Sequence, residues 1–254
     1  MNTAYVDIDH WANNKNPPRK FNQNPVSTMK LKGIVFDLDS TLVQSHVDFP
    51  KMKRNIIQLL ESNGHPPGTL STTDQTTVII MEHAEREWDR QRKPEGERRR
   101  LRDAITVYMN QGELEAIETL KVIAGAAAAV EKLKAKGLKL SVLTRGHHGY
   151  AVEALKKTGM HRYFDVILGR GETPQPKPYR EAIDYTVKQM GLTVDDVVMV
   201  GDHQIDYDSA KNSRCRFIGV ATGRRGLKSW ENETAPPVLL DSVADLPSYL
   251  EENS

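Results

Sequence analysis

The sequence has little of several features that define common protein classes. One cysteine among 254 residues, Cys215, excludes an intrachain disulfide framework and a cysteine-based metal site. No apolar run approaches the ~20 residues of a membrane-spanning helix, and the N-terminus shows no apolar signal region. A formal net charge of +1 argues against broad binding to nucleic acid or anionic membranes. We therefore expect a soluble cytoplasmic protein without a nucleic-acid or membrane partner; its oligomeric state is left open.

The residues that are present divide the chain into segments of different pattern. Residues 1–29 are rich in Asn, Pro and Lys, show no periodicity, and are predicted to be a disordered tail. Residues 30–44 begin with the apolar strand pattern "LKGIVFDLD", and strands and helices alternate over residues 121–254. Alternation of this kind predicts an α/β fold, a Rossmann-like doubly wound parallel sheet with helices on both faces.

The segment between these two parts, residues 45–120, has a different character. It shows no strand alternation and contains three helical patterns, so we predict an inserted all-helical cap domain. We expect the core of this cap to include Ile79, Ile80, His83 and Trp88, although a place for Trp88 near a ligand cleft stays open. The predicted helices cover residues 49–64, 76–93 and 95–121.

The cap also contains a basic run, "GERRRLR", at residues 96–102. Taken alone, this run suggests a nucleic-acid surface. The whole stretch from 43 to 120, however, holds 11 Lys or Arg against 13 Asp or Glu. A solvated helix face with ion pairs between neighbouring turns is the better interpretation.

Polar side chains follow the predicted strands at the point where each strand ends. In open α/β sheets, ligands bind beyond the carboxyl ends of the strands. No strand end supplies a glycine-rich phosphate loop of the GxGxxG or GxxxxGK[ST] kind. The candidates are Asp37 and Asp39 after the first strand, Thr144 after the second, Lys177 before a helix, and Asp202 and Asp206 one helical turn apart after the fourth.

Several carboxylates at one sheet edge require a positive charge. Oxygen ligands without His or Cys suit Mg²⁺, which prefers one or two carboxylates, several waters and a substrate phosphate. Thr144 adds a neutral hydroxyl donor, and Lys177 adds a cation that can hold a phosphoryl oxygen or a carboxylate. Together these groups favour phosphoryl transfer through an aspartyl intermediate, with a second carboxyl group serving as acid and base.

At this point the sequence resembles the haloacid dehalogenase superfamily of hydrolases. "FDLDSTLV" is similar to the nucleophile motif DxDx[TV]L, and "LSVLTRG" to the second motif, a Ser or Thr that ends a strand. "KPYREAI" is similar to the lysine motif, and "VGDHQIDYDSA" to the acidic GDxxxDxxxA motif. All four motifs occur in the order of the family. The resemblance implies a cap of the kind seen in phosphoglycolate phosphatases and β-phosphoglucomutases, which closes over the site and selects the substrate.

The resemblance also implies roles for individual residues, which no spacing argument alone would assign. Asp37 and Asp202 would bind Mg²⁺ directly, and Asp39 would contribute its backbone carbonyl. The remaining roles are Asp37 as nucleophile, Asp39 as general acid/base, Lys177 as the group that orients Asp37, Thr144 and Arg145 as ligands of the substrate phosphate or of a second anionic group, Thr41 as support for the nucleophile loop, and Asp206 as support for metal-bound water or Lys177.

Asp39 separates the reaction types of the superfamily. An acidic residue two positions after the nucleophile is typical of phosphatases and phosphomutases, whereas dehalogenases lack it. We therefore expect a Mg²⁺-dependent phosphatase that hydrolyses a small phosphomonoester metabolite such as 2-phosphoglycolate. The alternatives are a phosphomutase of the same superfamily, a dehalogenase-like hydrolase and, last, a non-catalytic binding protein.

Two positions depart from the family pattern, and three others admit a second interpretation. Ser40 stands where Gly is commoner, and Arg180 stands where a second Pro often follows the Lys-Pro pair. "TPQPKP" also allows a shifted alignment that places Thr173 in the position of the lysine. Arg145 can equally be an ordinary surface arginine, and Asp206 an N-terminal helix residue favoured by the helix dipole.

Overall fold

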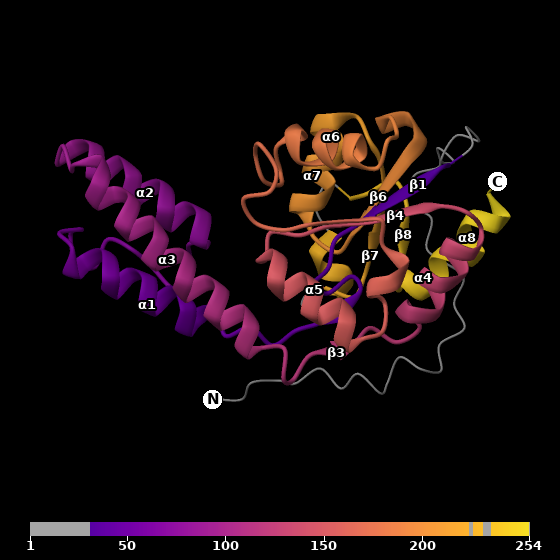
Figure 1. Ribbon diagram of the computed structural model, residues 1–254, viewed down its shortest axis with the longest axis horizontal. Helices are drawn as coiled ribbons and strands as arrows, with labels where there is room; N and C mark the ends of the chain where they lie inside the picture. Colours follow the sequence, from indigo (N-terminus) through magenta and orange to yellow (C-terminus); the bar gives the residue numbers. More distant parts are fainter. Residues whose placement is uncertain (1–30, 224–225, 231–234, 254) are drawn as a thin grey trace.

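The computed structural model describes residues 31–223, 226–230 and 235–253 (Figure 1). The predicted tail, residues 1–29, lies outside the described residues. Within them, no helix combines the length and the apolar character that crossing a bilayer requires.

The core contains a six-stranded parallel sheet in the order β5-β4-β1-β6-β7-β8. Strand β1 lies inside the sheet, where Gly33 pairs with Lys139 of β4 on one side and with Val197 of β6 on the other. This arrangement confirms the predicted Rossmann-like doubly wound sheet. The strands are β1 (Gly33–Phe36), β4 (Lys139–Leu143), β5 (Val166–Leu168), β6 (Val197–Gly201), β7 (Arg216–Val220) and β8 (Leu239–Leu240).

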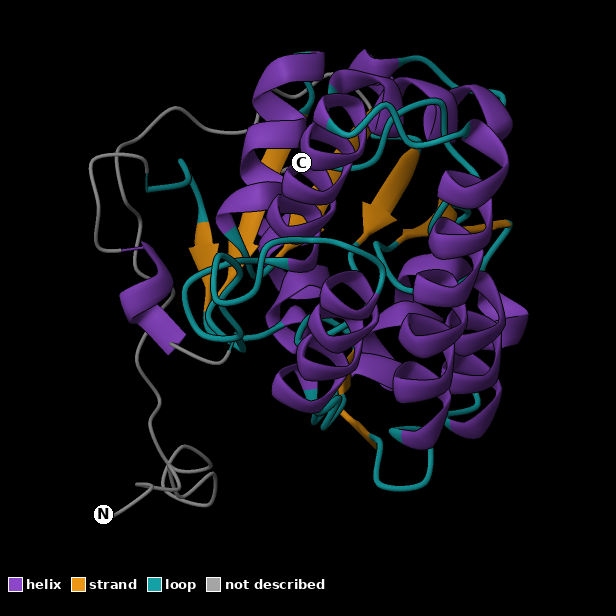
Figure 2. Ribbon diagram, turned by 90° about the vertical axis from the view of Figure 1, so that its left-hand side faces the viewer, coloured by secondary structure: helices purple, strands orange, loops and turns teal. Residues whose placement is uncertain are grey.

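Helices cover both faces of this sheet, as Figure 2 shows. Alternate residues of β1 supply the two faces: Ile34 and Phe36 belong to one apolar core, and Val35 belongs to the other. The first core includes residues of α4 (Ala126–Ala135), α5 (His148–Lys157) and α8 (Leu246–Glu252). The second includes residues of α6 (Arg180–Gln189) and α7 (Gln204–Ser213). Because both faces are buried, the strands read as continuous apolar runs rather than alternating ones.

Three helices form the insertion, which stands beside the core in Figure 1. They are α1 (Phe49–Ser62), α2 (Thr77–Arg90) and α3 (Glu95–Glu115). Their apolar faces form a separate core, in which Ile80 and Trp88 are both buried. Ile79, in contrast, is 37% exposed, so its prediction as a core residue was wrong. It precedes Ile80 by one residue, and the 100° step of the helix turns its side chain away from the core.

The junction between cap and core differs from the pattern read in the sequence. A two-residue strand, β2 (Val43–Gln44), pairs antiparallel with β3 (Lys121–Val122). The predicted helix over 95–121 therefore ends six residues early, at Glu115. Lys121 and Val122 form backbone pairs with a segment that is distant in sequence. Helical periodicity cannot detect such pairing.

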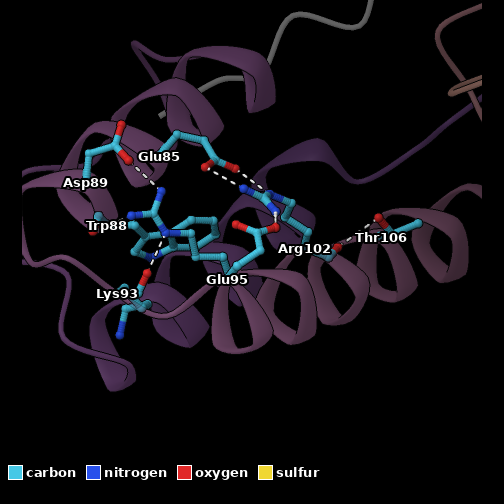
Figure 3. Close-up of polar contacts among 8 residues, drawn as sticks. Glu85, Trp88, Asp89, Lys93, Glu95, Arg102 and Thr106 are labelled. Carbon is cyan, nitrogen blue, oxygen red and sulfur yellow. Dashed lines mark hydrogen bonds and ion pairs between the residues drawn. The ribbon is translucent and has the colours of Figure 1, made fainter.

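The basic run of α3 is tied to its neighbours inside the cap, as the close-up in Figure 3 shows. Arg102 bonds both carboxylate oxygens of Glu85 on α2, at 2.6 and 2.8 Å, and Glu95 on its own helix at 2.7 Å. Arg98 forms an ion pair with Asp89 of α2 and donates to two backbone carbonyl oxygens. Two of the four arginines in this run thus join α2 to α3, whereas the sequence predicted ion pairs between neighbouring turns of one helix.

Candidate active site

The loop after β1 carries the first two candidate carboxylates. The Asp37 backbone N–H donates to Val200 O of β6 at 2.9 Å, which fixes the start of this loop against the neighbouring strand. Ser40 follows with φ +63°, in the left-handed region that favours glycine. This backbone conformation explains why Gly is commoner at the position. The Ser40 carbonyl accepts a hydrogen bond from the Thr222 hydroxyl, which ties the loop to the end of β7.

Lys177 joins two of the aspartates. Its ammonium group lies 2.6 Å from Asp37 Oδ1 and 2.6 Å from Asp206 Oδ1, and the residue is only 3% exposed. Burial works to lower the pKa of Lys177, but the carboxylates of Asp206 and Asp37 outweigh it and raise the pKa above its usual range. Thr173 instead donates to the backbone of Gln175, so of the two alignments it is Lys177 that reaches Asp37.

Asp202 and Asp206 approach the same point from the end of β6. Carboxylate oxygens of Asp37, Asp202 and Asp206 all lie within 4.8 Å of one another. Thr41 supports this approach, because its hydroxyl donates to Asp202 Oδ1 at 3.3 Å. A Cβ at Gly201 would lie 2.5 Å from an Asp206 carboxylate oxygen, so the residue before Asp202 has no room for a side chain.

Asp206 combines the structural and the functional interpretations of its position. One oxygen accepts from the His203 backbone N–H at 3.2 Å and caps the start of α7, as a first-turn acidic residue does. The other oxygen binds Lys177. The His203 ring accepts from the Ile205 N–H, so this histidine is part of the helix cap.

The charges of this cluster suit a divalent cation. Three carboxylates and one ammonium group leave a formal charge of −2 when all are ionised. Burial first, and then the carboxylates of Asp37 and Asp206, raise the pKa of Asp202 to about 9. Burial raises the pKa of Asp37 to about 6 against the opposing effect of Lys177. A cation among these oxygens would favour their ionised forms, and an all-oxygen donor set fits Mg²⁺.

Asp39 is held apart from this cluster by two hydroxyl donors. Its Oδ1 accepts from Ser45 Oγ at 2.6 Å and from the Tyr150 hydroxyl. Burial raises the pKa of Asp39 to about 6, while these two hydrogen bonds oppose the rise. The side chain is thereby oriented by groups other than Lys177, which gives the two aspartates of the first motif different surroundings.

Thr144 and Arg145 follow β4. The Thr144 hydroxyl accepts from the Gly146 N–H at 3.0 Å, which leaves its own proton available to a ligand. No carboxylate of the described residues lies within 4.0 Å of the Arg145 guanidinium. Burial lowers the pKa of Arg145, and the charges of Asp206 and Asp37 oppose that effect. Arg145 is thus a partly buried cation near the carboxylates that forms no ion pair with them.

Four residues that sequence reasoning missed complete the surroundings of the site. Ser45 and Tyr150 bind Asp39, while Glu113 of the cap and Arg170 of the core form an ion pair at 2.8 Å beside the loop after β4. Tyr150 occupies an apolar position of a helix and reads as a core residue. Glu113 gives no signal either, because it is one of several acidic residues in α3 and its partner Arg170 lies 57 residues away in the chain.

The comparisons with known proteins identify the family. A model of the haloacid dehalogenase-like hydrolases matches residues 34–220. That span covers most of the chain and contains all eight candidate site residues. The chain therefore belongs to the haloacid dehalogenase-like hydrolases, as the four motifs predicted, and relatives that are named phosphatases support a phosphatase-type enzyme.

Individual relatives are similar at low identity over most of the chain. A phosphoglycolate phosphatase of Neisseria meningitidis is 26% identical over 218 residues, which are 85% of this chain and 92% of the relative. The pyrophosphatase PpaX of Halalkalibacterium halodurans is 23% identical over 220 residues, 86% and 96% of the two chains.

Solved structures share the fold. A predicted phosphoglycolate phosphatase of Haemophilus somnus superposes with a TM-score of 0.60 at 22% identity, covering 88% of this chain and 99% of the other. A β-phosphoglucomutase of Clostridium difficile reaches a TM-score of 0.60 at 16% identity, with 88% and 96% coverage. Both confirm an α/β core with a helical cap.

Proposed function

We propose that this protein is a Mg²⁺-dependent hydrolase of small phosphomonoesters that works through an aspartyl-phosphate intermediate. The observation that carries the proposal is the position of Lys177, with Asp37 and Asp206 both 2.6 Å from its ammonium group. Three separate segments of the chain meet there around one buried cation. The arrangement neutralises a nucleophilic carboxylate without blocking its second oxygen.

In the first half-reaction, an Asp37 oxygen attacks phosphorus and the ester bond to the leaving alcohol breaks. Asp39 in its protonated form gives its proton to the leaving oxygen. Lys177 orients Asp37, and the Thr144 hydroxyl donates to a phosphoryl oxygen. Mg²⁺, when held by Asp37, Asp202 and the Asp39 carbonyl, would supply positive charge that stabilises the transferred phosphoryl group.

In the second half-reaction, water attacks the phosphorus of the aspartyl phosphate and loses a proton to ionised Asp39. Inorganic phosphate leaves, the Asp37 carboxylate is regenerated, and Asp39 is protonated for the next cycle. One residue therefore serves as acid and then as base, which requires a pKa near the working pH. The raised pKa of Asp39, caused mainly by burial, suits this double role.

We further propose that the substrate carries a second anionic group close to the phosphate, as 2-phosphoglycolate does. Arg145 supports this step, because its guanidinium forms no ion pair with a carboxylate of the described residues and follows Thr144 directly, so it offers a bidentate site for a carboxylate or a second phosphate. The named activities of the relatives are compatible with it. The cap, residues 45–120, would cover the site and exclude water during the reaction.

A phosphate-release screen tests the proposed function. Purified protein is incubated with phosphorylated metabolites, and released phosphate is measured with added Mg²⁺ and with EDTA. We expect release from 2-phosphoglycolate that stops with EDTA and returns when Mg²⁺ is restored. Transfer to a second sugar phosphate without release would instead identify a phosphomutase, and no turnover of any ester would reject the proposal.

Replacing Arg145 with Gln tests the second anionic group. The lost charge-assisted contact is expected to lower kcat/KM for 2-phosphoglycolate on the order of 10- to 100-fold. p-Nitrophenyl phosphate has no second anion, so its kcat/KM should change much less. Arg162→Gln serves as the matched control. Arg162 is an exposed arginine of the α/β domain that donates to the Tyr163 hydroxyl. An equal loss on both substrates would show that Arg145 binds the phosphate itself or only supports the loop.

A further inference from the structure

We propose that Glu113, a cap residue, is a positioning residue for the phosphate-binding loop, residues 144–148. This inference rests on the proposed function, since it assigns Glu113 to the phosphate site of that reaction. Glu113 lies in the last turn of α3 and is only 5% exposed. A carboxylate of this kind is rarely buried unless bonded groups replace its hydration. Its partners therefore show what its position achieves.

Among the described residues, every hydrogen-bond partner of the Glu113 side chain belongs to the core. The His147 backbone N–H donates to Glu113 Oε2 at 2.8 Å. Arg170 donates from Nη1 to Oε1 at 2.9 Å and from Nη2 to Oε2 at 2.8 Å. The ion pair has the bidentate geometry that fixes orientation as well as distance. A single side chain of the cap thus holds both the loop backbone and the arginine that follows β5.

Arg170 bonds the same loop at two further residues. Its backbone N–H donates to Gly146 O at 2.7 Å, and its Nη1 lies 3.4 Å from Arg145 O. Its Nη2 also donates to Asn110 Oδ1 of α3 at 2.8 Å. Glu113 and Arg170 therefore form a clamp on the backbone between Thr144 and His148, which they bond at three consecutive residues, 145, 146 and 147.

This placement affects the reaction because the clamped residues carry the groups that bind phosphate. Gly146 N–H bonds the Thr144 hydroxyl and so directs its free proton, and Arg145 projects from the same loop. A carboxylate so near an anion site would repel the substrate if it were unpaired, and Arg170 removes that repulsion. The cap consequently orients the phosphate ligands without touching the phosphate, and the loop depends on where the cap sits.

The test compares Glu113→Gln with Glu115→Gln. Gln is isosteric with Glu but places an amide N–H₂ against the His147 N–H or an Arg170 donor, so the clamp loses at least one bond. We expect KM for p-nitrophenyl phosphate and the inhibition constant of inorganic phosphate both to rise on the order of tenfold. Half-maximal Mg²⁺ should stay unchanged, because Asp37 and Asp202 do not contact the clamp. Glu115 is exposed and pairs with Lys51 within the cap, so its variant should match wild type.

Hydrogen exchange supplies a readout that does not depend on activity. In Glu113→Gln the amides of residues 145–148 should exchange faster than in wild type, while those of β1 and β6 stay protected. A lower thermal midpoint with unchanged phosphate inhibition and unchanged loop exchange would overturn the proposal and leave Glu113 as a tie between domains. If wild type hydrolyses no ester, the proposed function fails, and loop exchange alone decides whether Glu113 positions the loop.

Arg170→Lys provides a second variant in case the first does not fold. Lysine keeps the charge but cannot form the bidentate pair or reach Glu113, Asn110 and Arg145 together. The same two changes, weaker phosphate inhibition and faster loop exchange, are expected in smaller measure. Wild-type values of both in a folded Arg170→Lys protein would contradict the clamp.

Discussion

Replacing Asp37 with Asn is expected to lower turnover of every phosphate ester substrate by at least about 10⁴-fold. The amide cannot attack phosphorus to form the covalent intermediate. Its oxygen can still accept the hydrogen bond that Lys177 now gives Asp37 Oδ1, so the fold of the loop should persist. The measurement is steady-state phosphate release at saturating Mg²⁺, with circular dichroism to verify folding. Wild-type turnover in this variant would reject both the assignment of Asp37 as the nucleophile and the proposed mechanism.

Asp208→Asn is the matched control for that experiment. Asp208 is also an aspartate of the acidic motif, two residues after Asp206, but its carboxylate accepts from the Gln204 side chain instead of Lys177. Along a helix, two residues correspond to a turn of about 200°, which points Asp208 away from the cluster. Its variant should therefore retain wild-type turnover. A comparable loss in both variants would indicate a general charge effect and not the loss of a nucleophile.

Replacing Asp39 with Asn is expected to slow turnover by roughly 10²- to 10⁴-fold, the usual contribution of a general acid/base. The Asn carbonyl oxygen can still accept from Ser45 and Tyr150, so the side chain should keep its place. Only its backbone carbonyl is assigned to Mg²⁺. The Mg²⁺ concentration for half-maximal activity should consequently remain that of wild type.

The leaving group separates the two steps in which Asp39 acts. p-Nitrophenolate leaves without needing a proton, whereas the water that attacks the aspartyl phosphate must lose one. Rapid mixing of Asp39→Asn with p-nitrophenyl phosphate should therefore give a stoichiometric burst of nitrophenol followed by slow turnover. A large loss of Mg²⁺ affinity with normal turnover at high Mg²⁺ would contradict the assigned role.

Much of the fold could be predicted because its signals are local. Each strand of the core is an apolar run, each helix has one apolar face, and their alternation limits the topology to a parallel sheet with helices on both sides. The exact ends of helices and the orientation of single side chains could be predicted less well from the sequence. Helix α3 ends at Glu115 because the segment beyond it turns to pair with β2, and Ile79 faces outward because the neighbouring Ile80 occupies the core.

The candidate site likewise contains residues that the sequence predicted and residues that it did not. The aspartates, Thr144 and Lys177 occur in short motifs at strand or helix boundaries, and parallel strands bring such boundaries to one edge. Tyr150 and Glu113 do not belong to any such motif. A buried tyrosine and a helix glutamate are common in any sequence, and their importance depends on what the folded chain places beside them.

The sequence by itself determined the α/β core, the helical insertion, the family and the set of residues able to form an oxygen-rich phosphate site. The core and the insertion follow from periodicity, and the family and the site residues follow from four short motifs that resemble those of the haloacid dehalogenase superfamily. All of these signals are carried by residues close together in the sequence. Only the tertiary structure decided how those residues are held. It placed Lys177 between Asp37 and Asp206, Asp39 between Ser45 and Tyr150, and Glu113 of the cap against the loop after β4. Apart from the bond between Ser45 and Asp39, which lie six residues apart, these contacts join segments far apart in the chain, and their geometry depends on the packing of the whole domain.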